Sequence, residues 1–235
     1  MLAGPGVERG LIGPAEAARI WDRHLINCGL VCELLAPYPA EAADAVADAS
    51  RGPVPGRQRS DYLVDGQLAD LGSGAGLPGI VLAILRPDLR VTLVEPMARR
   101  TAFLAECVAE LGLRNVEIRR GRAEELAGEI AVDVVTSRAV ARLNRLAELA
   151  AGIARPGGLV LAIKGASAET ELAEAGPVLR RLGVSEAEVM TAGDELVANG
   201  LIDQPTTVVR FRTARSGRVG TGQSRPGASR RRPRR

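Results

Sequence analysis

Short apolar runs and amphipathic segments alternate along the middle of the chain. The apolar runs are short enough to be buried strands, and they lie at Gln67–Leu71, Arg90–Val94, Val116–Arg119, Val132–Ser137 and Gly158–Ile163. The amphipathic segments predict helices over Pro78–Leu85, Met97–Leu111, Arg142–Ala154 and Ala168–Leu182. Because this alternation is typical of a parallel sheet with helices on both faces, we predict an α/β fold with a mostly parallel sheet.

The pattern changes on both sides of this region. Ala15–Ala36 is amphipathic and predicts a helix ending before Pro37, with one apolar stripe formed by Ile20, Leu25, Cys28, Val31 and Leu35. Near the other end, Val189–Met190 and Thr207–Phe211 predict a closing pair of strands. Pro177 lies inside the last predicted helix and is expected to kink or break it.

Composition divides the chain into three parts. We predict an N-terminal helical segment with an irregular insert over residues 1–60, a folded domain over 61–212 and a disordered arginine-rich tail over 213–235. The tail holds eight arginines and no acid, so the rest of the chain has 23 basic against 28 acidic residues, although the whole chain has a net charge of +3. The tail either attracts phosphate groups without sequence preference or is only a solubilising end.

The length and composition exclude several classes of protein. A chain of 235 residues, 46% of them hydrophobic, suits one compact domain. No apolar run reaches the ~18 residues of a membrane helix, and the first residues lack the features of a signal peptide, so we expect a cytoplasmic protein without a membrane contact.

The cysteines and the single histidine predict neither a disulfide framework nor a metal site. Cys28 and Cys32 are four residues apart with no ligand partner nearby, and Cys107 is expected to fill the core. His24 has no obvious carboxylate partner in the sequence, which favours a surface or interdomain role over that of a general base.

The most informative segment is DLGSGAGLPG, residues 70–79, between the first strand and its helix. From Gly74 it matches the G-x-G-x-x-G dinucleotide pattern, whereas from Asp70 it is D-x-G-x-G-x-G, a pattern of S-adenosylmethionine enzymes. A carboxylate at Asp70 would repel a pyrophosphate, and Pro78 removes an N–H group that a phosphate would need. The cationic, phosphate-free S-adenosylmethionine therefore fits better, although a turn without ligand remains an alternative. The predicted cofactor residues of this segment are Asp70, Gly72, Gly74 and Gly76.

Two further segments extend the predicted cofactor site. Glu95 ends the second strand, 23 residues beyond Gly72, where a carboxylate can accept both ribose hydroxyls of either cofactor. After the third strand, Ala123 and Glu124 are placed to lie against an adenine. The alternative for Glu124 is a solvated start of a helix.

The segment TSRAV after the fourth strand bears on the methyl acceptor. It lacks the Asn/Asp-Pro-Pro-aromatic turn used for exocyclic amines, and no cysteine nucleophile lies at this edge of the sheet. The N7 atom of guanine has a lone pair and no proton to lose, so its methylation needs positioning rather than a base. Arg138 and Lys164, the only lysine in the chain, are the candidate catalytic residues because they can donate to the O6/N7 edge of guanine. The alternative is that Arg138 and Lys164 are ordinary charged residues at the edge of the sheet, without a role in the reaction.

Five segments together resemble one known family: WDRHLINC, DLGSGAGLPGIVLAILRP, VTLVEPMARRTAFL, TSRAV and LAIKG. Over roughly Arg19–Arg212 the chain is similar to the RsmG family, the bacterial small-subunit ribosomal RNA methyltransferase G, formerly glucose-inhibited division protein B. The resemblance implies a class I methyltransferase fold, Rossmann-like with a mostly parallel seven-strand sheet and a small N-terminal helical segment. It also implies N7 methylation of one guanine in 16S rRNA with S-adenosylmethionine as donor.

The resemblance assigns roles to particular residues. It implies that Gly72, Leu77, Ala123, Glu124 and Arg138 line the cofactor site, and that Arg23, His24 and Lys164 contact RNA. The expected partner is 16S rRNA or the small-subunit ribosomal particle, bound by a monomer.

Three other functions remain open from the sequence. The first is an NAD-dependent oxidoreductase using GAGLPG, and the second is a non-catalytic RNA- or ribosome-binding protein on a methyltransferase scaffold. The third is a small-molecule methyltransferase, which would have an enclosed pocket rather than an open edge lined by Arg138, Arg142, Arg145 and Lys164.

Overall fold

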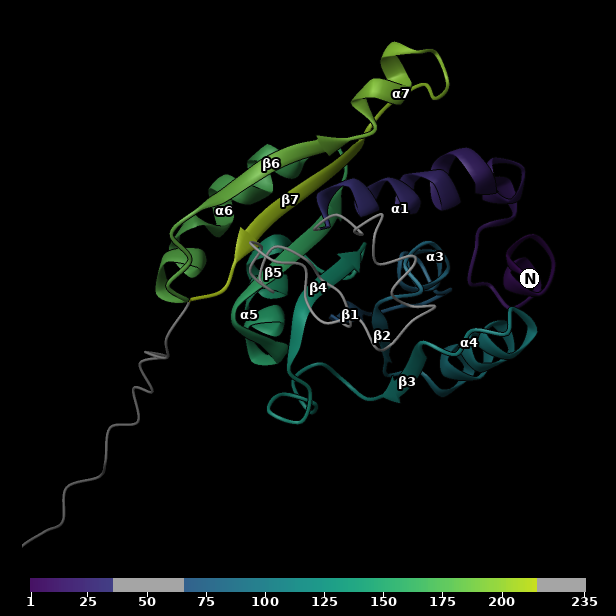
Figure 1. Cartoon of the computed structure of the whole chain (residues 1–235), viewed down its shortest axis with the longest axis horizontal. Coiled ribbons are helices and arrows are strands. Elements are labelled where there is room, and N and C mark those ends of the chain that lie inside the picture. The colour runs from purple at the N-terminus through teal and green to yellow at the C-terminus, as the bar shows by residue number, and fades with distance from the viewer. Residues whose placement is uncertain (36–65, 215–235) are drawn as a thin grey trace, which may run out of the picture.

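A computed structural model describes residues 1–35 and 66–214, and its centre is a seven-stranded sheet in the order β3-β2-β1-β4-β5-β7-β6 (Figure 1). The strands are β1 Gln67–Leu71, β2 Arg90–Glu95, β3 Val116–Arg120, β4 Val132–Arg138, β5 Ala154–Lys164, β6 Ala187–Ala192 and β7 Thr206–Arg212. Strands β1 to β5 are parallel, whereas β7 runs antiparallel to both β5 and β6. This confirms the predicted α/β class and the closing pair of strands.

Helices cover both faces of the sheet, because alternate residues of the central strands bury their side chains on opposite sides. In β5, Leu159 and Leu161 belong to one apolar core while Val160 and Ala162 belong to the other. The first core packs against α3 Gly79–Leu85 and α4 Ala98–Glu110, and the second against α5 Leu143–Ile153 and α6 Ala168–Arg181. These four helices are the ones predicted.

The N-terminal helical stretch, residues 14–34, packs against the sheet's first core and reaches its carboxyl edge. It consists of η2 Pro14–Arg19, η3 Ile20–Ile26, α1 Asn27–Gly29 and η4 Leu30–Leu34, and a separate turn η1 Leu2–Gly6 precedes it. The predicted apolar stripe is confirmed: Ile20, Cys28, Val31 and Leu35 are buried, and Leu25 is partly buried against the same core. Two hydrogen bonds tie this stretch to the β6–β7 region: Thr206 Oγ1 donates to the Asn27 carbonyl (2.9 Å), and the Gly193 N–H donates to Glu33 (2.8 Å).

The expected break of the helix at Pro177 is wrong. Helix α6 continues through this residue, which lies on the exposed side of the helix, where the carbonyl that loses its partner can be hydrated. Ala175 and Leu179 on either side are buried in the second core, and their packing keeps the two halves together.

The structure also adds elements and leaves some expectations untested. Strand β5 begins at Ala154, earlier than predicted, and a short helix α7 Asp194–Ala198 lies between the last two strands. The predicted insert Pro37–Asp61 and almost all of the arginine-rich tail lie outside the described residues. Within residues 1–35 and 66–214, no helix is long and apolar enough to cross a membrane.

Candidate functional site

The glycine loop, residues 72–78, connects β1 to α3 at the carboxyl edge of the parallel strands. Gly72, Gly74 and Gly76 all have positive φ angles, of 66°, 56° and 88°. At Gly72 a Cβ atom would lie 2.5 Å from Cγ2 of Val140, which follows β4, so the loop passes too close to this side chain for any residue but glycine. The predicted role of these glycines in shaping the turn therefore agrees with the backbone geometry.

Most N–H groups of this turn already have acceptors within the protein. The Gly72 and Ser73 groups donate to the Val94 carbonyl, and those of Gly76 and Leu77 donate to the Ser73 carbonyl. The Gly74 N–H donates to the Glu95 carboxylate (3.0 Å) and the Gly79 N–H to the Asp70 carboxylate (3.0 Å). Since a pyrophosphate is bound by free N–H groups at such a turn, this arrangement disfavours a dinucleotide.

The expectation that Asp70 presents its carboxylate to the ligand is wrong. Its side chain is fully buried beneath the loop, where Oδ2 accepts the N–H of Gly79 at the start of α3. Burial raises the pKa of Asp70 to about 7, and the Oδ1 atom has no hydrogen-bond partner among the described residues. Asp70 therefore shapes the turn from below, because the strand places its side chain between the sheet and the helix.

Glu95 lies at the end of β2, beside the glycine loop. Its side chain is 1% exposed; Oε2 accepts the Gly74 N–H and Oε1 accepts the Met97 N–H, each at 3.0 Å. The Arg100 guanidinium lies 3.7 Å from Oε2. Each carboxylate oxygen has a second lone pair, so the predicted contact with ribose hydroxyls stays compatible with these bonds.

The predicted contact of Glu95 with S-adenosylmethionine can be tested by replacing Glu95 with glutamine, which is expected to raise the KM for this cofactor about 10-fold with little change in kcat. The amide can accept only one of the two backbone N–H groups, and an unpaired buried donor costs about 1–3 kcal/mol. Steady-state kinetics at saturating RNA measure both constants. A lowered kcat at unchanged KM would place Glu95 in the reaction step instead.

Ala123 and Glu124 follow β3 on the other side of the predicted cofactor site. Ala123 and Leu77 of the glycine loop are both 9% exposed, so each offers a small apolar surface. Glu124 is exposed and forms an ion pair with Arg145 of α5. No helix starts at Glu124, so the alternative of a solvated helix start is wrong.

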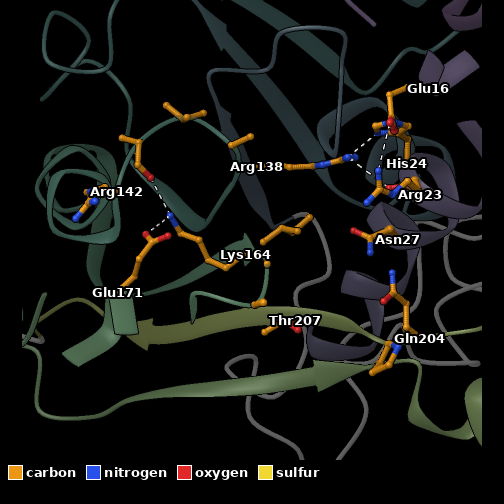
Figure 2. Close-up of a pocket in the computed structure, with 17 residues that line it drawn as sticks. Glu16, Arg23, His24, Asn27, Arg138, Arg142, Lys164, Glu171, Gln204 and Thr207 are labelled. Carbon is orange, nitrogen blue, oxygen red and sulfur yellow. Dashed lines mark hydrogen bonds and ion pairs between the residues drawn. The ribbon is translucent and has the colours of Figure 1, made fainter. Parts of the chain in front are cut away.

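A pocket of about 820 Å³ opens beyond the ends of β4 and β5 (Figure 2). Its walls come from the N-terminal helical stretch, the segment after β4, the end of β5 and the start of β7. The predicted residues Arg23, His24, Arg138 and Lys164 all line it. The structure thus brings together the predicted catalytic and RNA-contacting residues, from three distant parts of the chain.

Arg138 is the last residue of β4, and its side chain extends across the pocket to the N-terminal helical stretch (Figure 2). Ser137 pairs with Leu71 of β1, so Arg138 follows at the level of Gly72. The next residue, Ala139, has a φ of 55°, a conformation that residues other than glycine rarely adopt. Such strain is concentrated at functional sites, and here it lies directly after Arg138, in the segment that lines the pocket.

His24 does have a carboxylate partner, contrary to the interpretation of the sequence. Its Nε2 lies 3.0 Å from Oε2 of Glu16, and its Nδ1 lies 2.5 Å from Nη2 of Arg138. The sequence hid this contact because η2 and η3 form one helical stretch that brings Glu16 back onto His24. Burial, followed by the charge of Arg138, lowers the pKa of His24 below 6.5, although Glu16 opposes both effects.

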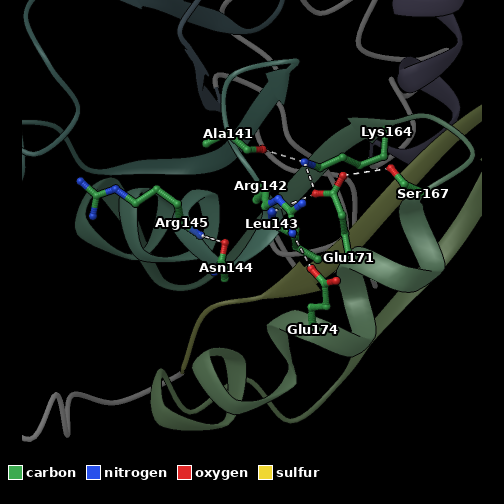
Figure 3. Close-up of polar contacts among 9 residues, drawn as sticks. All are labelled: Ala141, Arg142, Leu143, Asn144, Arg145, Lys164, Ser167, Glu171 and Glu174. Atoms are coloured by element: carbon green, nitrogen blue, oxygen red, sulfur yellow. Dashed lines mark hydrogen bonds and ion pairs between the residues drawn. The ribbon is translucent and has the colours of Figure 1, made fainter.

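Lys164 ends β5 and is held in place by two acceptors (Figure 3). Its Nζ donates to the Ala141 carbonyl and to Oε2 of Glu171, each at 2.8 Å, and the side chain is 9% exposed. Glu171 also accepts the Leu143 N–H at the start of α5 (3.0 Å). Burial would raise the pKa of Glu171, but these bonds, led by that from Lys164, lower it below 4.5. Lys164 therefore fixes the segment after Arg138 and keeps one N–H for a ligand.

Five polar or charged residues that line the pocket were not predicted from the sequence: Glu16, Asn27, Glu171, Gln204 and Thr207. The side-chain amides of Asn27 and Gln204 have no hydrogen bond within residues 1–35 and 66–214, so both are available to a ligand. Only Asn27 lies within a quoted motif, WDRHLINC; the other four stand in segments without a pattern that indicates chemistry.

The cysteines have the structural role expected of them. Cys107 is buried in the first core, and burial raises the pKa of both Cys28 and Cys32 to about 11, which makes each a poor nucleophile. Among the residues that the structure describes, no group of histidine, cysteine and carboxylate side chains could hold a metal ion.

Comparison with known proteins decides the family. The family model for rRNA small subunit methyltransferase G, called GidB, matches residues 58–197. The chain is also 49% identical over 219 residues to a "Ribosomal RNA small subunit methyltransferase G" of Nocardioides sp., a match covering 93% of this chain and 75% of that one. The chain belongs to the rRNA small subunit methyltransferase G family. This confirms the resemblance stated from the five motifs.

Other similar proteins differ in their sequence identity to this chain and in the share of it that they match. A protein of the same name from Thermobifida fusca is 46% identical, over 99% of this chain and 84% of its own. Among solved structures, a SAM-dependent O-methyltransferase from Thermotoga maritima has a TM-score of 0.49 and 15% identity, over 73% of this chain and 70% of that one. Which residues contact cofactor and RNA, and the expected monomer, stay predictions.

Proposed function

We propose that this methyltransferase G family member transfers the methyl group of S-adenosylmethionine to N7 of one guanine in 16S rRNA. The observation that supports the donor most directly is the glycine loop, whose N–H groups are bonded to the protein's own carbonyls and carboxylates. A loop of this kind suits a ligand that approaches the backbone closely but brings no phosphate. Membership of the family supports the rRNA substrate.

The residues around the loop fit this cofactor. At Gly74 the Gly72 carbonyl oxygen, at 3.7 Å, is the only atom of residues 1–35 and 66–214 within 4 Å of the position of a Cβ, so this part of the protein leaves the backbone open to a ligand there. Gly72, Gly74, Gly76, Leu77 and Glu95 would hold the cofactor from one side, with Ala123 and Glu124 on the other. When bound, S-adenosylmethionine supplies an electrophilic methyl group attached to a sulfonium. Asp70 contributes by holding the loop from beneath.

The pocket beyond β4 and β5 is the proposed place for the guanine. The N7 lone pair attacks without losing a proton, so the protein has to orient the base rather than deprotonate it. Arg138 and Lys164 carry donors toward the pocket for the acceptor atoms of the base, while Asn27 and Gln204 offer amides to its remaining edge. Arg23 and His24 lie at the same opening, on the side from which an RNA strand would enter.

The structure gives little support to the alternative functions. An NAD-dependent oxidoreductase would need N–H groups that this loop has already committed. A small-molecule methyltransferase would enclose its substrate, whereas Arg23 is half-exposed at the opening of this pocket and Arg142 and Arg145 are exposed at the same edge of the sheet. A non-catalytic RNA-binding protein would not require the cofactor loop to keep its shape.

The direct test is transfer of a labelled methyl group from S-adenosylmethionine to small ribosomal subunits that lack the modification. Chemical cleavage at N7-methylguanosine, followed by reverse transcription, should give a stop at a single guanine of 16S rRNA. Calorimetry should show binding of S-adenosylhomocysteine and none of NADH. Unlabelled rRNA, or binding of NADH alone, would contradict the proposal.

Arg138→Ala is expected to lower the turnover at least ~10-fold, because the pocket loses the donor that crosses it. The measurement is the initial rate of methyl transfer at saturating substrates. Arg181→Ala is a suitable control. It removes an exposed arginine at the end of α6 that forms an ion pair with Glu148 of α5, and it should keep the normal rate. Normal turnover in Arg138→Ala would remove this residue from the site.

A further inference from the structure

A chain of hydrogen bonds joins the N-terminal helical stretch to the end of β4. The Arg138 guanidinium donates to three acceptors there: Nη2 to Nδ1 of His24 (2.5 Å) and to the Arg23 carbonyl (3.4 Å), and Nη1 to the Cys28 sulfur (3.3 Å). Within residues 1–35 and 66–214, no other residue is hydrogen-bonded to this guanidinium. The position of Arg138 in the pocket therefore depends on residues about 110 positions earlier in the sequence.

The donors and acceptors in this series of hydrogen bonds fix the protonation state of His24. An arginine side chain only donates, so Nδ1 of His24 must accept and the imidazole must be neutral, with its proton on Nε2. That Nε2 lies 3.0 Å from Oε2 of Glu16, which accepts the hydrogen bond from this N–H group. The second oxygen of Glu16 accepts from Nη1 of Arg23 at 3.2 Å. The carboxylate thus selects the imidazole tautomer that can receive Arg138.

We propose that Glu16 and His24 are positioning residues for methyl transfer: Glu16 sets the tautomer of His24, and His24 holds the Arg138 guanidinium at the pocket. The inference rests on the proposed function of Arg138. These three contacts use at most three of the five N–H groups of the guanidinium, so the rest remain for cofactor or RNA. The N-terminal helical stretch is in this way part of the reaction site.

The charges around His24 give the proposal a pH dependence with a definite sign. His24 faces Glu16 from η2, Arg23 from its own element and Arg138 from β4. Burial and then the Arg138 charge lower its pKa below 6.5, while Glu16 acts in the opposite direction. Protonation at acidic pH would remove the acceptor and set two positive charges against each other, so Arg138 would move away.

The first test needs no substrate, because His24 is the only histidine of the chain. In a tag-free protein labelled with ¹⁵N, NMR should show one imidazole, in the Nε2–H form at neutral pH, that titrates below 6.5. Arg138→Gln should raise the pKa of His24, and Glu16→Gln should lower it. Glu106→Gln, which breaks the comparable exposed pair with Arg9, should leave it unchanged. An Nδ1–H tautomer, or a pKa that neither variant moves, would overturn the proposal.

The second test measures methyl transfer to small ribosomal subunits. His24→Asn retains an acceptor oxygen close to the place of Nδ1 and should keep kcat/KM within about 3-fold, whereas His24→Phe should lose about 10-fold. The wild-type rate should fall on the acidic side near the pKa found by NMR. This decline should disappear in His24→Asn and shift to lower pH in Glu16→Gln.

The outcomes separate this inference from the proposed function. A wild-type protein that transfers no methyl group contradicts the proposed function. The NMR titration still decides whether the hydrogen bonds that join Glu16, His24 and Arg138 exist. An active wild-type protein whose His24→Phe variant has the same rate and pH profile contradicts the inference alone. A loss of activity explained by a lower melting temperature, with no change of pH profile in Glu16→Gln, would also contradict it.

Discussion

Gly72→Ala is expected to weaken binding of S-adenosylhomocysteine about 100-fold. The residue has a φ of 66°, which costs roughly 1–2 kcal/mol for an L-residue. The new Cβ atom would also lie 2.5 Å from Cγ2 of Val140, and relieving such overpacking costs about 1–3 kcal/mol. The loop would therefore leave the shape that receives the cofactor. A combined cost of about 3 kcal/mol corresponds to roughly two orders of magnitude in affinity. Isothermal calorimetry measures the change.

Two further variants separate the contributions to this effect. Gly112→Ala carries the same strain, since φ is 63°, but no atom of the described part of the chain lies within 4 Å of the new Cβ, and the residue lies after α4, away from the site. It should bind S-adenosylhomocysteine normally. Adding Val140→Ala to Gly72→Ala should recover the part of the loss caused by the contact, relative to Val140→Ala alone. Normal affinity in Gly72→Ala would show that the approach of the loop to Val140 has no role in binding.

The sequence was sufficient for the fold because its signals there are local. Period-two burial, apolar run length and glycine turns are properties of neighbouring residues, and they placed β1 and the four helices around the sheet within a few residues. The error at Pro177 has a different origin. Propensity describes an isolated helix, whereas packing of Ala175 and Leu179 in the core stabilises α6 across the proline.

The sequence indicated several residues that line the pocket, but not which groups they contact. Motifs indicated Asp70, His24, Arg138 and Lys164, and the latter three do meet at one pocket. The sequence does not show whether a side chain points into the pocket or beneath it, nor which distant group it contacts. Asp70 was therefore assigned to the ligand although it lies under the loop, and His24 was denied a carboxylate that the fold supplies. Contacts between segments far apart in sequence are set only by the packing of the whole chain.

Replacing Asp70 by asparagine is expected to remove a pH dependence of the folding stability. Burial raises the pKa of Asp70 from 3.8 to about 7, so between these values the folded protein holds a proton that the unfolded chain has released. The stability linked to this proton is fully present below about 3.8 and is lost as the pH rises through 7. A shift of this size corresponds to a loss of up to about 4 kcal/mol in the free energy of unfolding.

Urea unfolding of the wild type and of Asp70→Asn tests this pH dependence. The unfolding is measured at several pH values between about 4.5 and 8, a range about as wide as the expected shift in the pKa of Asp70. The asparagine oxygen can still accept the Gly79 N–H at the start of α3, so the turn keeps its hydrogen bond, but the residue no longer titrates. The difference in unfolding free energy between the two proteins should change steadily in favour of the variant as the pH rises. Glu110→Gln, at an exposed position at the end of α4, serves as the control and should give a nearly constant difference. If Asp70→Asn also gives a constant difference, the carboxyl group is not held in its protonated form, and its buried place beneath the glycine loop would need another source of stabilisation.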